Sequence, residues 1–328
     1  MKVLIIGGTR FIGLHLVRKL LERDHEIFLF NKGITPNPFT GDVHNIIGDR
    51  KKTGSLRKGL GKERFDIAID MIAYDADEMR DAIETLEGRV KHYLFISTRS
   101  VYDQARLKYP IRENEPTIDD PSDAYGYNKR QAELILLRAY EEKSFPGTIL
   151  RLPAVYGPHD YQAREWYFIR RILDGREHML LPNFGFSVYH REYAGNIAEQ
   201  LSFLMTKQES MGQVYNSGHI NFQSYKDLIR LAAKLIGADF NLYGVLATDM
   251  PWRVPLTEPL LHISSTAKLE NLGYKEPYDI RAGLKETIKY FKEHPVKKWI
   301  FSERQKIDMF DYNLEDKLIA ERGVRIGD

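Results

Sequence analysis

The sequence contains no cysteine among its 328 residues, which excludes disulfide bonds, thiol catalysis and metal sites with cysteine ligands. Neither sign of charge is in excess: 48 Lys and Arg face 46 Asp and Glu, which argues against a protein that mainly holds a polyanion. No apolar run approaches the length of a membrane span, and the first residues, MKVLIIGG, lack the apolar run and cleavage site of a signal peptide. The ten histidines show no metal-binding spacing such as HExxH. We therefore expect a soluble cytoplasmic protein with no metal site and no membrane partner.

A strand, a glycine turn and a helix are expected at the N-terminus. Lys2–Ile6 is a short apolar run without turn residues, typical of a strand buried on both faces. Gly7, Gly8 and Gly13 follow, and glycine allows a tight turn and a close approach of bare backbone to a ligand. Beyond Gly13 the apolar residues adopt helical spacing. This combination is typical of the anion site that opens dinucleotide-binding folds, and a plain tight turn is the alternative.

Further strands and helices alternate along the first half of the chain. We expect strands at Glu26–Phe30, Asn45–Ile47, Phe65–Asp70 and His92–Ile96, and a helix at about Asp75–Leu86. Alternation with short connections indicates a doubly wound parallel sheet with helices on both faces. Ligands of such sheets bind beyond the carboxyl ends of the strands. This rule places the Gly7 turn, Asp49, Ala73 and Thr98 along one edge.

The second expected strand ends at Asn31-Lys32-Gly33, where NAD-binding folds usually have an acidic residue for the adenosine ribose. No acidic residue is present there. Lys32 is able to pair with a 2′-phosphate instead, as is Arg10 in the glycine turn. A solvated loop charge is the other interpretation of Lys32. On this basis we favour NADP over NAD.

A Tyr-x-x-x-Lys pattern opens a long helix. Tyr125 and Lys129 are four residues apart and share a helix face. Lowering a phenol pKa from about 10 to about 7 takes roughly 4 kcal/mol, which one cation at about 4 Å supplies at an effective dielectric of about 20. Alone, such a pair is usually a surface feature, but the glycine turn and Thr98 precede it here, which favours proton transfer by Tyr125. Tyr127 has no lysine four residues on, and we assign it to packing or substrate contact.

Five segments occur in a characteristic order: GGTRFIG at 7–13, STRSVY at 97–102, YGYNK at 125–129, RLPAVYGP at 151–158 and HREYAGNIAEQL at 190–201. Together they make the chain, up to about Pro295, resemble an extended short-chain dehydrogenase/reductase of the NAD-dependent epimerase/dehydratase family. The resemblance implies a Rossmann sheet with a smaller C-terminal substrate lobe. It also implies NAD(P) as the cofactor and a nucleotide-sugar as the substrate class.

The resemblance further assigns roles to individual residues. Thr98 would hydrogen-bond the reacting hydroxyl, Tyr125 would transfer its proton, and Lys129 would bind the nicotinamide ribose. Arg191 and Arg253 would contact a substrate diphosphate, and surface ion pairs are the alternative for both. The expected cofactor contacts are Gly7, Thr9, Arg10, Phe11, Ile12, Gly13, Asn31, Lys32, Asp49, Arg50, Ala73, Ser97, Tyr125, Lys129, Pro153 and Val155, and Tyr102 joins the substrate contacts.

The sequence departs from the family pattern at three places. Arg10 stands where the family usually has a glycine, and the segment after Ala73 is short and lacks the asparagine of the proton relay. Arg99 and Ser100 stand where sugar 4,6-dehydratases have an Asp-Glu pair. Without this acid and base the elimination of water has no evident catalyst, so we do not expect dehydration.

GGTRFIG and residues 158–185 also resemble the chloroplast stem-loop RNA-binding branch of the same family. Members of that branch have often lost the catalytic tyrosine. This chain retains both Tyr125 and Lys129, which favours an enzyme with redox chemistry over an RNA-binding protein.

Two parts of the chain are expected to form separate regions. Residues 1–155, completed by about 187–220, would be the dinucleotide-binding domain, and 156–186 with 221–294 the substrate lobe. The remaining expected elements are helices at Trp166–Leu173, Glu199–Met205, Tyr225–Ile236 and Ile280–Phe291, a strand of the main sheet at Gln213–Asn216, and a rigid loop at Pro251–Pro255.

Residues 295–328 mix aromatic and charged residues and are expected to be helical. They would pack on the body or on a second copy of the chain, with a nucleic-acid arm as the minor alternative.

These observations favour an NAD(P)-dependent epimerase in which hydride moves to the nicotinamide and returns to the opposite face of the keto intermediate. A simple NADP-dependent carbonyl reductase would use the same residues and differ in consuming the cofactor. An RNA-binding protein on a reused Rossmann fold is the alternative from another class. The balanced charge disfavours nucleic acid as a partner, and a homodimer is left open.

Overall fold

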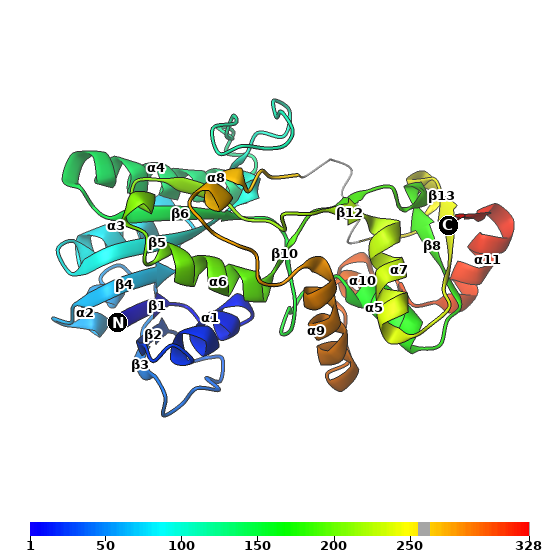
Figure 1. Ribbon diagram of the computed structural model, residues 1–328, viewed down its shortest axis with the longest axis horizontal. Helices are drawn as coiled ribbons and strands as arrows, with labels where there is room; N and C mark the ends of the chain where they lie inside the picture. Colours follow the sequence, from blue (N-terminus) through cyan, green and yellow to red (C-terminus); the bar gives the residue numbers. More distant parts are fainter. Residues whose placement is uncertain (255–262, 328) are drawn as a thin grey trace. The chain divides into compact units, whose positions relative to one another are not determined.

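The computed structural model describes residues 1–254 and 263–327, which divide into two compact units (Figure 1). Unit 1 comprises Met1–Pro153, Ala194–Gly218 and Ser264–Pro277. Unit 2 comprises Ala154–Tyr193, His219–Ile263 and Tyr278–Asp328. None of the helices within the described ranges has both the length and the hydropathy that a bilayer crossing requires.

The main sheet of unit 1 confirms the doubly wound parallel arrangement predicted from the sequence. Within the described residues its seven strands lie in the order β11 (Val214–Asn216), β6 (Gly147–Leu152), β5 (Val90–Thr98), β4 (Phe65–Asp70), β1 (Lys2–Ile6), β2 (Glu26–Asn31) and β3 (His44–Ile47). All neighbouring strands run parallel. The chain starts in the middle of the sheet and winds outward in both directions, so the turn after β1 lies where the strand order reverses.

Helices cover both faces of this sheet (Figure 1). On one face α2 (Ser55–Leu60), α3 (Ala76–Leu86) and α4 (Ala124–Lys143) bury apolar residues against the strands. On the other face α1 (Ile12–Leu21) packs against α6 (Ala194–Leu204), and α8 (Ala267–Asn271) contacts β11. The Asp123 carboxylate caps α4 by accepting from Gly126 N–H (3.1 Å), which fixes where the Tyr125 helix begins.

Unit 2 has a core of large aromatic side chains, including Trp166, Phe168, Tyr225 and Phe291. Before the C-terminal extension, its described helices include α5 (Trp166–Leu173), α7 (Tyr225–Ile236) and α9 (Ile280–Glu293), and the first two have the bounds predicted from sequence. A small sheet has the order β14 (Val324–Arg325), β13 (Asn241–Val245) and β8 (His178–Pro182). Two strand pairs complete the unit: β7 (Val155–Tyr156) with β10 (Glu192–Tyr193), and β9 (Val188–Tyr189) with β12 (Gln223–Ser224).

The C-terminal extension packs within unit 2. It contains α10 (Ile300–Gln305), α11 (Tyr312–Arg322) and β14, which pairs antiparallel with β13. Trp299, Met309 and Phe310 are buried in the aromatic core. Inside it the carboxylate of Glu315 accepts from the Arg171 guanidinium of α5 (3.1 Å), and neither side chain is exposed to solvent. The extension is therefore part of the core of unit 2 and not an appended arm.

Candidate active site

The turn after β1 is built so that only glycine fits at three positions. Gly7 and Gly8 have φ values of +105° and +94°, which side chains rarely adopt. A Cβ on Gly13 would lie 2.4 Å from the Cα of Gly8, so the start of α1 touches bare backbone. Phe11, at the N-cap of α1, contributes no side-chain cap. This cradle fits the pyrophosphate of a dinucleotide, which binds to backbone N–H groups at such a turn.

An ion pair lies at the carboxyl ends of β2 and β3. Lys32 Nζ is 3.0 Å from Asp49 Oδ1, and this pairing lowers the pKa of the Asp49 carboxyl below its usual value. Asn31 is buried, and its Oδ1 accepts from Gly33 N–H (2.8 Å). Lys32 and Asp49 are thus brought together at the carboxyl ends of these two strands, a pairing that the sequence did not predict, and the charge of Lys32 is directed to a protein carboxylate.

Asp70, at the carboxyl end of β4, organises the segment that carries Ala73. Its Oδ1 accepts from Ala73 N–H (2.9 Å), and its Oδ2 accepts from the Tyr93 hydroxyl (2.6 Å) and pairs with Arg50 (2.8 Å). Both charged side chains are buried. The Arg50 guanidinium, predicted as a cofactor contact, therefore neutralises Asp70 inside unit 1.

Lys129 lies beneath this edge with 2% of its surface exposed. Its ammonium donates to the carbonyl oxygens of Ala73 (2.7 Å) and Ile96 (2.7 Å). Burial lowers the pKa of Lys129 to about 8, although the carboxylates of Asp70 and Glu133 act in the opposite direction. Of the three donors of this ammonium, two are used in these hydrogen bonds, and the ammonium also lies 5.1 Å from the Tyr74 ring centroid and 4.7 Å from the Phe95 ring centroid.

The low pKa of Lys129 predicts a pH dependence of stability. The pKa of Lys129 is about 8 in the folded chain and 10.5 for an ordinary lysine, so the destabilisation caused by its buried charge is absent above pH 10.5 and grows as the pH falls towards 8. From about pH 7 to about pH 9.5, the free energy of unfolding should rise by about 2 kcal/mol relative to a Lys129→Met variant. Urea unfolding of both proteins at both pH values measures this change. A gap that is the same at both values would contradict the prediction.

Thr98 and Tyr125 come from elements in direct contact. Thr98 ends β5 and is buried, and its Oγ1 accepts from Ser100 N–H (3.2 Å). Tyr125 is the second residue of α4, and 49% of its surface is exposed. Between them, a Cβ on Gly126 would lie 2.2 Å from the Ser100 carbonyl oxygen, so glycine is needed for α4 to start against this turn. Since Lys129 also bonds to Ile96 on β5, strand end and helix are fixed to each other.

Glu133, one turn beyond Lys129 on α4, was not predicted as a site residue. Its carboxylate is fully buried and accepts from Ser97 Oγ (2.7 Å), from Arg151 Nε (2.9 Å) and Nη2 (2.7 Å), and from Arg130 Nη1 (2.9 Å). Burial alone would raise the pKa of Glu133, but Arg151 and the other donors hold it below its usual value. The only signal in the sequence is its spacing of four from Lys129, which puts both on the inward face of α4.

Tyr102, predicted as a substrate contact, is 1% exposed. Its hydroxyl donates to Asn216 Oδ1 (2.7 Å), and the Arg151 guanidinium lies 4.7 Å from its ring centroid. Burial raises its pKa. Tyr127 lines an open pocket of about 490 Å³ with Ile118 and Leu134. Among the predicted cofactor contacts, Pro153 ends the first segment of unit 1 and Val155 begins β7 in unit 2.

Arg191 and Arg253, the predicted diphosphate contacts, are both in unit 2 and differ in burial. Arg191 is buried, with Nη1 3.7 Å from Glu165 Oε1 and its guanidinium 5.3 Å from the Tyr189 ring centroid. Arg253 is exposed, and its backbone N–H donates to Gln305 Oε1 (2.7 Å). Pro255, the end of the predicted rigid loop, lies outside the described residues.

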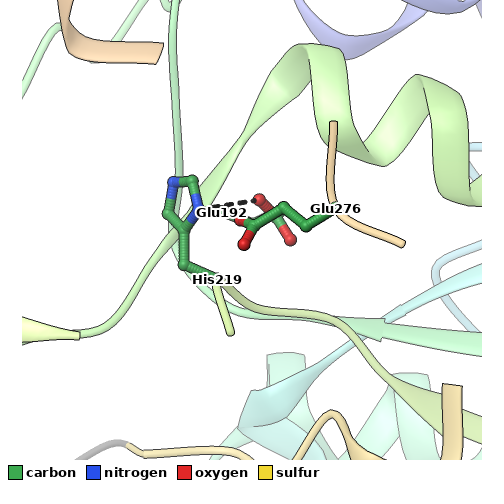
Figure 2. A group of neighbouring side chains, drawn as sticks. All are labelled: Glu192, His219 and Glu276. Carbon is green, nitrogen blue, oxygen red and sulfur yellow. Dashed lines mark ion pairs between the residues drawn. The ribbon is translucent and has the colours of Figure 1, made fainter. Parts of the chain in front are cut away.

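His219 and Glu192 form a buried pair in unit 2 (Figure 2). His219 Nδ1 lies 3.8 Å from Glu192 Oε1, and its Nε2 lies 2.8 Å from the Tyr156 hydroxyl. The backbone N–H of His219 donates to the Arg191 carbonyl (3.0 Å). His219 thus contacts both Arg191, through the backbone, and the neighbouring Glu192, through its ring, an arrangement that the sequence did not predict.

Comparison with known proteins identifies the family. Residues 3–218 match the model of the NAD dependent epimerase/dehydratase family, and the chain belongs to this family. It is 27% identical over 303 residues (86% of this chain, 77% of the relative) to the chloroplast stem-loop binding protein of 41 kDa b of Arabidopsis thaliana. It is 25% identical over 328 residues (89% of this chain, 90% of the relative) to dTDP-D-glucose 4,6-dehydratase of Homo sapiens. The fold is similar to that of the UDP-glucose 4-epimerase of Thermotoga maritima with UDP-glucose (TM-score 0.72, 21% identity, 89% of this chain, 99% of that one).

Membership of this family confirms the resemblance, the Rossmann-type fold and the expectation of an NAD-dependent enzyme of the epimerase/dehydratase type. The roles of individual site residues, the preference for NADP, the homodimer, the cytoplasmic location and the absence of a nucleic-acid partner stay predictions.

Proposed function

We propose that the protein is an NAD(P)-dependent epimerase acting on a nucleotide-sugar. The observation that supports this best is the placement of Lys129, whose buried ammonium is anchored to Ile96 on the strand that ends at Thr98. Tyr125 opens the same helix one turn earlier. A cation held there favours the charged form of a nearby phenol, which is the condition for proton transfer at neutral pH.

Each residue has a distinct role in the proposal. Gly7, Gly8 and Gly13 would hold the pyrophosphate, and the third donor of Lys129 would hold the nicotinamide ribose. When bound, the nicotinamide accepts a hydride from the substrate and returns it. Tyr125 takes the proton of the reacting hydroxyl and gives it back, and Thr98 orients that hydroxyl by a hydrogen bond.

The substrate class rests on the similarity to proteins named for dTDP-glucose and UDP-glucose chemistry, and on Arg191 and Arg253 as diphosphate contacts. If the hydride returned to the opposite face of the keto intermediate of the sugar, the product would be the epimer, with no net use of cofactor. Arg99 and Ser100 follow Thr98 in place of an acid and a base, so we assign epimerisation and not dehydration.

For the cofactor we propose that both NAD and NADP are accepted, with a modest preference for NADP. Lys32 and Arg10 would contact the 2′-phosphate. The neutral Asn31 at the end of β2 lacks the carboxylate that would repel this group.

RNA binding is a second candidate function, favoured by the 27% identity to a chloroplast stem-loop binding protein. It predicts affinity for a stem-loop RNA that falls steeply with salt and is unaffected by substitution of Tyr125.

One experiment tests the enzymatic proposal. The protein is denatured, released nucleotides are identified by mass, and the native protein is incubated with NAD or NADP and a panel of UDP- and dTDP-sugars. We expect a co-purifying dinucleotide and interconversion of two sugar epimers without net change in reduced cofactor. Net consumption of cofactor would instead identify a carbonyl reductase. No dinucleotide and no conversion, together with salt-dependent RNA affinity, would establish the second candidate.

A further inference from the structure

We propose that Asp49 restricts the preference for NADP, because its carboxylate competes with the 2′-phosphate of the cofactor for the ammonium of Lys32. This inference rests on the proposed function in one respect, that a dinucleotide binds at the carboxyl edge of β1, β2 and β3. It assigns a specificity-determining role to an acidic residue that follows β3, in a fold where such a residue is usually sought at the end of β2.

The backbone holds the two charged residues opposite each other. Asn31 pairs with Ile47 in the parallel register of β2 and β3, and Gly48 N–H donates to the Asn31 carbonyl (2.9 Å). Lys32 directly follows Asn31, and Asp49 directly follows Gly48, so each charged residue stands one position beyond this hydrogen bond. Their side chains meet at 3.0 Å, so the ion pair closes across the ends of the two strands.

Asp49 is held in place by its own segment. Its Oδ1 accepts from the backbone N–H of Lys51 (3.0 Å), and its own N–H donates to Ser55 Oγ (3.1 Å). The pair with Lys32 and the hydrogen bond from Lys51 keep the pKa of this carboxyl low, so it is charged at neutral pH. Lys32 is the more movable partner, with a flexible stem and a side chain 43% exposed against 29% for Asp49.

NAD and NADP would interact differently with the ion pair of Lys32 and Asp49. The ribose hydroxyls of NAD donate hydrogen bonds, which a fixed carboxylate accepts. The 2′-phosphate of NADP needs Lys32, but it also brings two negative charges close to Asp49. Attraction to the ammonium and repulsion from the carboxylate then offset each other. Asn31 does not supply an alternative carboxylate, and its Oδ1 is already bonded to Gly33.

The test uses binding alone, with 2′,5′-ADP and ADP as probes of the two cofactors. Calorimetry on the full chain compares the native sequence with Asp49→Asn, Lys32→Met and the double variant. We expect Asp49→Asn to tighten 2′,5′-ADP about fivefold at low salt and not to tighten ADP, because the carboxylate that accepts its ribose hydroxyls is lost, with the difference between the two probes shrinking at high salt. In the Lys32→Met background the tightening should be much smaller, since no ammonium is left to compete for.

Each other outcome has a definite meaning. Unchanged or weaker binding of 2′,5′-ADP to Asp49→Asn, while ADP still binds, would overturn the role of Asp49. Equal tightening with and without Lys32 would show simple repulsion and overturn the competition. Failure of the native sequence to bind either probe would overturn the proposed function and not this inference in particular.

Discussion

A Tyr125→Phe variant is expected to bind the dinucleotide as the native sequence does and to lose at least about 100-fold in turnover. The substitution removes one hydroxyl from a half-exposed side chain and leaves the glycine turn and the Lys129 anchor unchanged. In the proposed mechanism, the group lost is the phenol that takes the proton of the reacting hydroxyl. Initial rates on the sugar identified in the panel, together with calorimetric titration of NAD(P), measure the two effects separately.

Tyr127→Phe is the matched control. Tyr127 lies two residues further along α4, has Gln131 and not a lysine four residues on, and lines the open pocket in unit 1. Its loss of a hydroxyl should change turnover by no more than about twofold. Full turnover in Tyr125→Phe, or equal losses in both variants, would exclude Tyr125 as the proton acceptor.

The fold was predictable wherever periodicity was unambiguous. Lys2–Ile6 and Phe65–Asp70 are strands with the predicted bounds because continuous apolar runs of this length suit strands buried on both faces. Tyr225–Ile236 is a helix with the predicted bounds because one stripe of its apolar residues faces the core of unit 2. Trp166–Leu173 also has the predicted bounds, and most of its residues are buried.

The differences occur where local preference is weak. α6 begins at Ala194 and not at Glu199: its first turn contains Gly195 and Asn196, which have low helix propensity, and the helix packs against α1. β14 was not predicted, since Val324–Arg325 is a two-residue strand that exists only through its pairing with β13.

In the candidate site, too, the sequence indicates the features that depend on local spacing and not those that depend on contacts between distant segments. The spacing of Tyr125 and Lys129 is a property of one helix, so the sequence indicates it directly. The partners of Glu133 come from other elements: Arg151 follows it by 18 residues and Ser97 precedes it by 36. A charged residue read from the sequence is usually a surface residue, and only the folded chain shows that this carboxylate is buried and fully bonded.

The buried pair of Arg171 and Glu315 is another such distant contact, with its two members 144 positions apart in the sequence. Glu315 Oε1 also accepts from Leu180 N–H (3.1 Å), and Arg171 donates to the carbonyl of Met309 (2.6 Å). A Glu315→Gln variant should lose about 3–5 kcal/mol of unfolding free energy, because the Arg171 charge would stay buried without its counter-ion. Urea unfolding measures the loss.

Neighbouring residues provide the control for this prediction. Asp316 is 45% exposed in its side chain and pairs with Arg176 and His178, so Asp316→Asn should cost less than about 1 kcal/mol. A double variant, Arg171→Met with Glu315→Leu, removes both charges and should recover most of the stability. This pattern would establish that the extension is held by a charge pair inside the core of unit 2. Equal effects of Glu315→Gln and Asp316→Asn would contradict it, and the apolar contacts of Trp299, Met309 and Phe310 would then account for the docking of the extension.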